Sequence, residues 1–220
     1  MNSTKKIIIC MDRDGTLTKD ENYYLGSAEN WKQQVEFMPG VIEGLKLSQS
    51  IPNSYRFIVT NQSGVALQEK QFAKLTEERM HEVNEYIISE LNNQKIDITT
   101  YFACPFVDYA YIKKSTKKGR TINPKYVMDN HPDLKPNPGM INNSLKHINL
   151  ERKDCLLFVI GDRYSDMELA KNADAVGILV ESYKTKELGD SELAKSNGFY
   201  VATNFLDAIK KIKQQVEQFT

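Results

Sequence analysis

The 220-residue sequence predicts an α/β fold in which helices cover both faces of a parallel β-sheet. Three observations support this prediction. Short apolar runs alternate with helix-like stretches, polar motifs stand where several of the runs end, and the composition, 40% hydrophobic and 26% charged, is that of a globular protein. No run approaches the length of about 20 apolar residues that a membrane span needs. Disordered, fibrous and membrane-spanning classes are therefore excluded.

The expected strands are short runs rich in Ile, Val, Leu and Phe. In chain order they are Lys6–Met11, Arg56–Thr60, Thr99–Cys104, Cys155–Ile160, Ala175–Val180 and Phe199–Ala202. The expected helices carry apolar residues at helical spacing or follow a proline. They are Gly40–Leu47, Gln71–Leu91, Gly139–His147, Asp166–Asn172 and Asn204–Phe219, the last with Asn204 as its N-cap.

Residues 105–134 interrupt this alternation, because they show no clear hydrophobic period. A segment of this length in a compact domain is typically functional, so we expect one domain, residues 1–220, with a long substrate-side loop at 105–134. The segment contains a basic cluster of Lys113, Lys114, Lys117, Lys118 and Arg120. Two interpretations of the cluster stay open: a solvated loop tip, or recognition of a second anionic group on the substrate.

The net charge and the cysteine pattern of the sequence indicate which ligands the protein binds and in which compartment it works. Lys and Arg together number 29, as do Asp and Glu, and a net charge of zero argues against nucleic acid as the main ligand. Cys10, Cys104 and Cys155 are odd in number and widely spaced, which indicates reduced thiols. The apolar run near the N-terminus is too short for a signal peptide. We therefore expect a cytoplasmic monomer without a membrane partner.

Four polar motifs follow an expected strand or precede an expected helix, at the edge where open α/β sheets bind ligands. They are Asp12-Arg13-Asp14-Gly15-Thr16, Thr60-Asn61-Gln62-Ser63-Gly64, Lys135-Pro136-Asn137-Pro138-Gly139-Met140 and Gly161-Asp162-Arg163-Tyr164-Ser165-Asp166. Each fragment alone is most often an ordinary turn or helix cap. Their occurrence together, each at a strand end or helix start, predicts a shared site.

The residue types in these motifs suit phosphoryl transfer. Asp12, Asp14 and Asp162 would bring three carboxylates into one cleft, where their repulsion favours a hard cation such as Mg²⁺. A hydroxyl, an amide and an ammonium group that could bind phosphoryl oxygens come from Thr60, Asn61 and Lys135. A carboxylate nucleophile, a cation and phosphate donors together indicate a phosphoryl-transfer enzyme.

The four motifs resemble the signature motifs of the haloacid dehalogenase superfamily. The likeness is strongest to its branch of heptose bisphosphate phosphatases and histidinol-phosphate phosphatases. It implies a Rossmann-like sheet sandwiched by helices, with no large cap domain. It further implies that Asp12 is the nucleophile that forms a phosphoaspartyl intermediate, and that Asp14 protonates the leaving oxygen and then accepts a proton from water. For that role we expect Asp14 to be crowded by neighbouring carboxylates, which favours its protonated form.

The same resemblance assigns the remaining positions. Mg²⁺ would be held by Asp12, the backbone carbonyl of Asp14, and Asp162. Phosphoryl oxygens would be bound by Thr60, Asn61 and Lys135. Asp166 would not bind the metal itself but would orient Lys135 or a metal-bound water. A stretch that forms part of the substrate mouth in relatives contains Tyr23, Tyr24 and Trp31, although Trp31 equally fits the core.

The sequence departs from these relatives at their zinc-binding loop, which reads Cys-x-His and then Cys-x-Cys-Arg-Lys-Pro. Here Cys104 is kept, but Phe106 replaces the histidine, and His131 and Asp133 stand at the later positions. A closed zinc site needs four N or S ligands, so structural zinc is not expected. Leu134 replaces the arginine that helps to hold the second phosphate of heptose bisphosphates.

We therefore expect a Mg²⁺-dependent phosphomonoester hydrolase acting on a small phosphorylated metabolite, with a sugar phosphate or bisphosphate as the leading substrate class. Two alternatives are a histidinol-phosphate phosphatase and a polynucleotide 3′-phosphatase. From another class, a catalytically silent phosphosugar-binding module also stays open. The intact Asp12, Asp14, Lys135 and Asp162 argue against the silent module. The sequence leaves open the substrate itself and whether any metal binds near Cys104.

Overall fold

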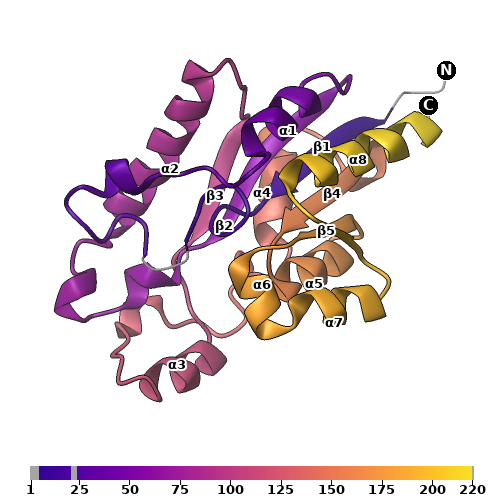
Figure 1. Cartoon of the computed structure of the whole chain (residues 1–220). Coiled ribbons are helices and arrows are strands. Elements are labelled where there is room, and N and C mark those ends of the chain that lie inside the picture. Colours follow the sequence, from indigo (N-terminus) through magenta and orange to yellow (C-terminus); the bar gives the residue numbers. More distant parts are fainter. Residues whose placement is uncertain (1–4, 21–23, 220) are drawn as a thin grey trace.

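The structure is a computed structural model that describes residues 5–20 and 24–219. Its centre is one parallel sheet with the strand order β3-β2-β1-β4-β5-β6 (Figure 1). The strands are β1 Lys6–Met11, β2 Ser54–Asn61, β3 Thr100–Cys104, β4 Cys155–Gly161, β5 Val176–Val180 and β6 Tyr200–Ala202. The order reverses between β1 and β4, and such a switch point opens a crevice at the carboxyl ends of the two strands.

Helices cover both faces of this sheet, as predicted. They are α1 Val41–Ser48, α2 Glu77–Asn93, α3 Tyr109–Thr116, α4 Gly139–His147, α5 Tyr164–Asn172, α6 Tyr183–Leu188, α7 Asp190–Ser196 and α8 Phe205–Phe219. Alternate residues of a strand point to opposite faces. Ile7 and Ile9 of β1 therefore pack with α1, α2 and α8 on one face, and Ile8 and Cys10 pack with α4 and α5 on the other. Burial on both faces explains why the central strands are almost continuously apolar.

Most of the expected elements are confirmed. The expected bounds of β1 and α4 match the structure, and Asn204 caps α8 by accepting a hydrogen bond from the Asp207 amide over 3.0 Å. The helix predicted from Gln71 begins only at Glu77. The Thr76 hydroxyl accepts a hydrogen bond from the Arg79 amide over 3.1 Å and so caps it.

The segment 105–134 is not irregular throughout, and that part of the prediction was wrong. It contains α3, which Asp108 caps by accepting a hydrogen bond from the Tyr111 amide over 2.7 Å. The helix escaped prediction because its fully buried side is a single residue, Ser115, which leaves no apolar period to detect. Figure 1 shows α3 at the opposite end of the molecule from the two termini. Two further short helices, α6 and α7, were also not predicted.

All three cysteines are buried and free, as expected for reduced thiols. In the described part of the chain, no helix combines the length and hydropathy needed to cross a bilayer.

The contact between α1 and α8 leads to a prediction about stability. A Cβ atom on Gly44 would lie 2.7 Å from Cδ1 of the buried Phe205 ring and 3.2 Å from the Leu206 Cα. We expect Gly44→Val to lower the free energy of unfolding by about 1–3 kcal/mol, because the core must deform to accept the side chain. Urea denaturation measures this change, with Lys46→Ala on the exposed side of α1 as the control. Equal stability of the two variants would contradict the close packing.

Candidate active site

Two of the predicted site residues stand at the switch point of the sheet. Asp12 follows β1, and its amide donates a hydrogen bond to the Ile160 carbonyl of β4 over 2.8 Å. Asp162 follows β4 itself. The adjacent strands thus deliver both carboxylates to the same crevice, as their positions in the sequence predicted.

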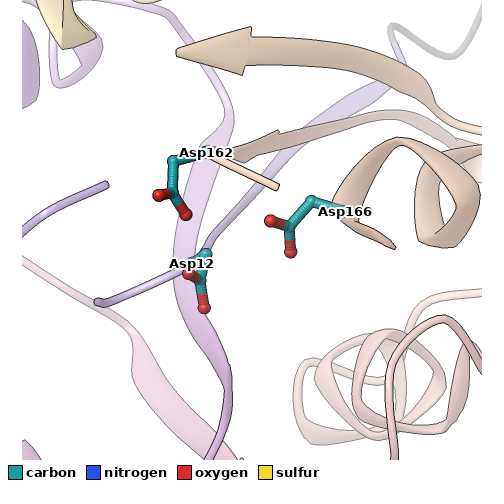
Figure 2. Close-up of side chains that lie close together, drawn as sticks. All are labelled: Asp12, Asp162 and Asp166. Carbon is teal, nitrogen blue, oxygen red and sulfur yellow. The ribbon is translucent and has the colours of Figure 1, made fainter. Parts of the chain in front are cut away.

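A third carboxylate, that of Asp166 at the start of α5, completes the cluster. Ligand oxygens of Asp12, Asp162 and Asp166 lie within 4.8 Å of one another, and all three residues are buried (Figure 2). The sequence interpretation had Asp166 orient Lys135, and Oδ1 of Asp166 does accept a hydrogen bond from Nζ of Lys135 over 2.7 Å. Its carboxylate also lies close enough to those of Asp12 and Asp162 to serve as a metal ligand itself, which the sequence interpretation did not include. The carboxylate of Asp14 does not belong to this group within the described residues. That the backbone carbonyl of Asp14 binds the metal remains a prediction.

The buried ammonium group of Lys135 binds two of these carboxylates. Its Nζ atom lies 2.6 Å from Oδ1 of Asp12 and 2.7 Å from Oδ1 of Asp166. One ammonium therefore faces three carboxylates, which leaves two negative charges uncompensated if all are ionised. Buried charges without partners are costly, so this excess calls for a divalent cation or for protons.

The pKa values reflect this excess negative charge. Burial raises the pKa of Asp12 to about 7, against the opposing effect of Lys135. Burial also raises the pKa of Asp162 well above its usual range, and the charges of Asp12 and Asp166 add to the effect. Burial alone would lower the pKa of Lys135, but the two carboxylates outweigh it and raise the pKa. The lysine is therefore a fixed cation, whereas the carboxylates need further compensation.

Asp162 is held in place but keeps one oxygen free. Its Oδ2 accepts a hydrogen bond from the Ser182 hydroxyl over 2.7 Å, and its backbone carbonyl accepts one from the Thr185 hydroxyl over 2.5 Å. Its Oδ1 is buried and has no hydrogen-bond partner in the described part of the chain. An oriented, unpartnered carboxylate oxygen inside an acidic cluster is a suitable ligand for a divalent cation. The residues present therefore fit the metal that the sequence predicted.

Ser182 and Thr185 were missed by the sequence interpretation. They form a reciprocal pair at the start of α6, in which the amide of each residue donates to the hydroxyl of the other over 3.1 Å. The available signal was a Ser-x-x-Thr spacing directly after a strand, which resembles a capping box. Nothing local in that pattern indicates that the cap also holds an aspartate twenty residues earlier.

Gly15 allows the loop after β1 to approach Asp162. Its φ angle is +86°, and a Cβ atom at this position would lie 2.3 Å from Oδ2 of Asp162. Both the backbone conformation and the space therefore require glycine.

Three hydrogen-bond donors surround the carboxylate of Asp14. Arg13 donates from Nε to one carboxylate oxygen over 2.9 Å and from Nη2 to the other over 2.8 Å. Gln62 Nε2 donates to the same carboxylate over 2.7 Å, and Arg13 is almost completely buried. A second contact, from Arg13 to Asn84 of α2 over 3.2 Å, fixes the guanidinium. Carboxylates also lie near, since the charge of Asp14 adds to the effect of burial in raising the pKa values of Asp12 and Asp20. The sequence interpretation did not foresee the donors, which include the neighbouring Arg13.

The two predicted phosphate ligands from β2 are placed differently. The buried Thr60 hydroxyl accepts a hydrogen bond from Gln62 over 2.8 Å. Asn61 accepts from the Lys135 amide over 3.1 Å and donates to the Lys135 carbonyl over 3.4 Å. Its amide therefore holds the backbone of the lysine. The Asn61 side chain has a second N–H that takes no part in these two contacts and could donate to a phosphoryl oxygen.

A cleft of about 750 Å³ opens at this site. Its lining includes the carboxylates of Asp12, Asp14 and Asp166. Basic side chains also line it, namely Arg13, Lys114, Lys118, Arg120, Lys135, Arg163 and Lys184. Tyr24 is part of the lining, as the resemblance implied. Trp31 belongs to the apolar core instead, and Tyr23 lies outside the described residues.

The segment that corresponds to the relatives' zinc-binding loop holds its side chains in a different arrangement. The Phe106 ring stacks on His131 at 4.1 Å between centroids with an interplanar angle of 13°. Nδ1 of His131 accepts a hydrogen bond from the Asp133 amide over 3.1 Å and lies 3.8 Å from the Cys104 sulfur. The histidine nitrogen that faces the thiol is therefore already engaged. Phe106, which replaces the histidine of the relatives' zinc-binding pattern, thus makes an aromatic stacking contact.

Several known proteins are similar to this chain in sequence or in fold. A family model described as HAD-hydrolase-like matches residues 133–208. D-glycero-β-D-manno-heptose-1,7-bisphosphate 7-phosphatase of Rhodopseudomonas palustris is 30% identical over 173 residues, which cover 78% of this chain and 81% of the relative. The histidine biosynthesis bifunctional protein HisB of Buchnera aphidicola subsp. Baizongia pistaciae is 31% identical over 82% of this chain and 42% of its own.

A solved structure with a similar fold is D,D-heptose 1,7-bisphosphate phosphatase from B. bronchiseptica, complexed with magnesium and phosphate. It has a TM-score of 0.68 and 20% identity, and the match covers 96% of this chain and 99% of the other. At this identity the likeness shows the α/β fold.

The raised pKa of Asp12 predicts how folding depends on pH without metal. A carboxyl group with a higher pKa in the folded state stabilises the fold below its unfolded pKa of about 4, and this contribution is lost as the pH rises through about 7. Asp12→Asn cannot titrate. In EDTA, its free energy of unfolding should therefore rise relative to wild type between about pH 4 and pH 8, as measured by urea denaturation. A pH-independent difference would contradict the raised pKa.

The stacked Phe106 and the engaged His131 predict that the purified protein holds no stoichiometric zinc. Elemental analysis of protein purified without chelator measures this directly. One zinc ion per chain would contradict the prediction.

Proposed function

Since this chain belongs to the haloacid dehalogenase superfamily of phosphatases, we propose that it hydrolyses a phosphomonoester of a small sugar bisphosphate, with Mg²⁺ and a phosphoaspartyl intermediate on Asp12. The observation that carries this proposal is the buried cluster of Asp12, Asp162 and Asp166 around Lys135. Its uncompensated negative charge and the free oxygen of Asp162 support a divalent cation at this point. A bound Mg²⁺ would reduce the repulsion between the carboxylates and the incoming phosphoryl group.

Asp12, Asp162 and Asp166, with the backbone carbonyl of Asp14, would hold the ion. Asp12 would attack the phosphorus atom, form an Asp–O–P bond and displace the alkoxide of the sugar. Lys135 is already paired with Asp12, and its charge would also stabilise the phosphoryl oxygens in the transition state. Among these residues, Lys135 directly contacts both Asp12 and Asp166, which supports a shared role.

Asp14 would transfer the protons in both half-reactions. In the first it would give a proton to the leaving oxygen, and in the second it would take one from the water that attacks the aspartyl phosphate. Its carboxylate lines the cleft, while Arg13 and Gln62 fix its orientation. Water would break the bond between phosphorus and the Asp12 oxygen, which releases phosphate and restores the carboxylate.

The relatives and the cleft support a sugar bisphosphate as substrate. The cleft of about 750 Å³ is within the usual range for small-molecule sites. Sequence relatives include a heptose-1,7-bisphosphate 7-phosphatase, and the likeness to HisB favours histidinol phosphate as the second candidate. Phosphate release from a heptose 1,7-bisphosphate, histidinol phosphate and a 3′-phosphorylated oligonucleotide separates these candidates. A kcat/KM highest for the bisphosphate supports the proposal, and a higher value for either other ester would overturn this substrate class.

The covalent mechanism predicts that Asp12→Asn lowers kcat by at least about 1,000-fold, because an amide cannot form the aspartyl phosphate. Asp154→Asn, at an exposed site, serves as the matched control and should keep wild-type turnover. Rapid acid quench with ³²P-labelled substrate should label the wild-type chain and leave Asp12→Asn unlabelled. Substantial turnover by Asp12→Asn would contradict the covalent mechanism.

The metal proposal is tested by removing divalent ions. EDTA should abolish phosphate release, and Mg²⁺ added in excess should restore it, because two buried negative charges would otherwise oppose substrate binding. Steady-state assays before and after dialysis measure this. Full activity of a protein shown by elemental analysis to be metal-free would contradict the proposal.

A further inference from the structure

Three basic side chains of the segment 105–134 line the same cleft as the aspartate cluster. They are Lys114, Lys118 and Arg120. The other two members of the basic cluster, Lys113 and Lys117, do not belong to this lining. The segment therefore presents a specific subset of its charges to the cleft, which a purely solvated loop tip does not require.

The end of α3 explains this selection. Lys114 and Lys118 are four residues apart, which is the spacing of side chains on one side of a helix. Gly119 then adopts a left-handed conformation with φ +70°, and the Arg120 amide donates to the Ser115 carbonyl over 3.1 Å. This Schellman-type ending turns the chain back, so that Arg120 reaches the cleft as well.

Among the residues that the structure describes, these three cations have no carboxylate partner. The other four basic groups of the lining are all paired. Arg13 binds Asp14, and Lys135 binds two carboxylates of the aspartate cluster. Arg163 binds Asp190 over 3.0 Å, and Lys184 binds Asp20. Asp20 is thereby occupied and does not offset the charges of α3. One part of the cleft wall consequently carries a surplus of positive charge, while the aspartate cluster carries a surplus of negative charge.

Arg120 is held in a fixed position without an acidic partner. Its Nη1 donates to the Tyr24 hydroxyl over 2.7 Å, and its guanidinium lies 5.4 Å from the Tyr24 ring centroid and 5.6 Å from that of Phe72. An arginine has five N–H donors, so others stay free for an oxyanion. A guanidinium fixed in this way loses little entropy when it binds a phosphate group through two hydrogen bonds.

We propose that Lys114, Lys118 and Arg120 form a subsite for a second phosphate group of the substrate, and that this subsite selects bisphosphates over monophosphates. This inference rests on the proposed function, in that the first phosphate is the one placed at Asp12. The two sites share one cleft, so a small bisphosphorylated molecule meets the acidic cluster with one phosphate and α3 with the other. Lys114, Lys118 and Arg120 are therefore specificity-determining residues.

The test compares KM for a heptose 1,7-bisphosphate and for the heptose 7-phosphate, which lacks the second phosphate. The double variant Lys114→Ala/Lys118→Ala is expected to raise KM for the bisphosphate by about tenfold or more. Its KM for the monophosphate, and kcat for both esters, should stay within about twofold of wild type. Arg120→Gln should show the same selective effect.

The matched control is Lys113→Ala/Lys117→Ala, which removes the same charge from the same segment but leaves the cleft lining unchanged. It should leave both KM values unchanged. Equal KM changes for the two esters, equal effects of both double variants, or no change in KM would each overturn the subsite. Thermal unfolding of every variant verifies that it is folded.

Failure of the proposed function looks different from failure of the subsite. If folded wild-type protein releases phosphate from neither ester, the proposed function fails. The subsite is then tested by calorimetric titration with the same bisphosphate. Binding about tenfold weaker in Lys114→Ala/Lys118→Ala than in Lys113→Ala/Lys117→Ala supports it, and equal binding or no binding to wild type overturns it.

Discussion

The contact of the buried Lys135 ammonium with Asp12 and Asp166 is the interaction on which the rest of the site depends. It joins three parts of the chain: the end of β1, the loop before α4, and the first turn of α5. A fourth part of the chain, the end of β2, contributes Asn61, which accepts a hydrogen bond from the Lys135 backbone amide. Removing one member of a buried ionic cluster leaves an uncompensated charge, so the three side chains are interdependent. Any role of Asp12 as a nucleophile requires this cation, because it stabilises the ionised carboxylate.

The single positive charge of Lys135 is not sufficient to balance the carboxylates of the site. Asp162 adds a third carboxylate, held by Ser182 and Thr185. Two glycines bring the segments together: a Cβ on Gly15 would lie 2.3 Å from Asp162, and one on Gly161 would lie 2.2 Å from Asp166. The backbone therefore concentrates negative charge beyond what Lys135 offsets. Such an arrangement is unfavourable in an empty protein and favourable around a divalent cation, which is the physical basis of the metal proposal.

Much of this could be predicted from the sequence, because the strands are local apolar runs and parallel strands end at the same edge of a sheet. Asp12, Lys135 and Asp162 were placed together on that basis, and the structure agrees. What escaped prediction depends on tertiary contacts. The pairing of Arg13 with Asp14, and the closeness of the Asp166 carboxylate to those of Asp12 and Asp162, are decided by loop geometry. The course of α3 is set by Asp108, Ser115 and Gly119, none of which produces a hydrophobic period.

The buried cluster of Asp12, Asp162 and Asp166 carries an excess negative charge, and a divalent cation would compensate it. Calorimetric titration of metal-free protein with Mg²⁺ at neutral pH, in the absence of substrate, tests it most directly. We expect one Mg²⁺ to bind per chain and this binding to be lost in Asp162→Asn, which removes the charge but keeps the shape of the side chain. Absence of binding to the wild type, or undiminished binding to Asp162→Asn, would show that the cluster is not a cation site.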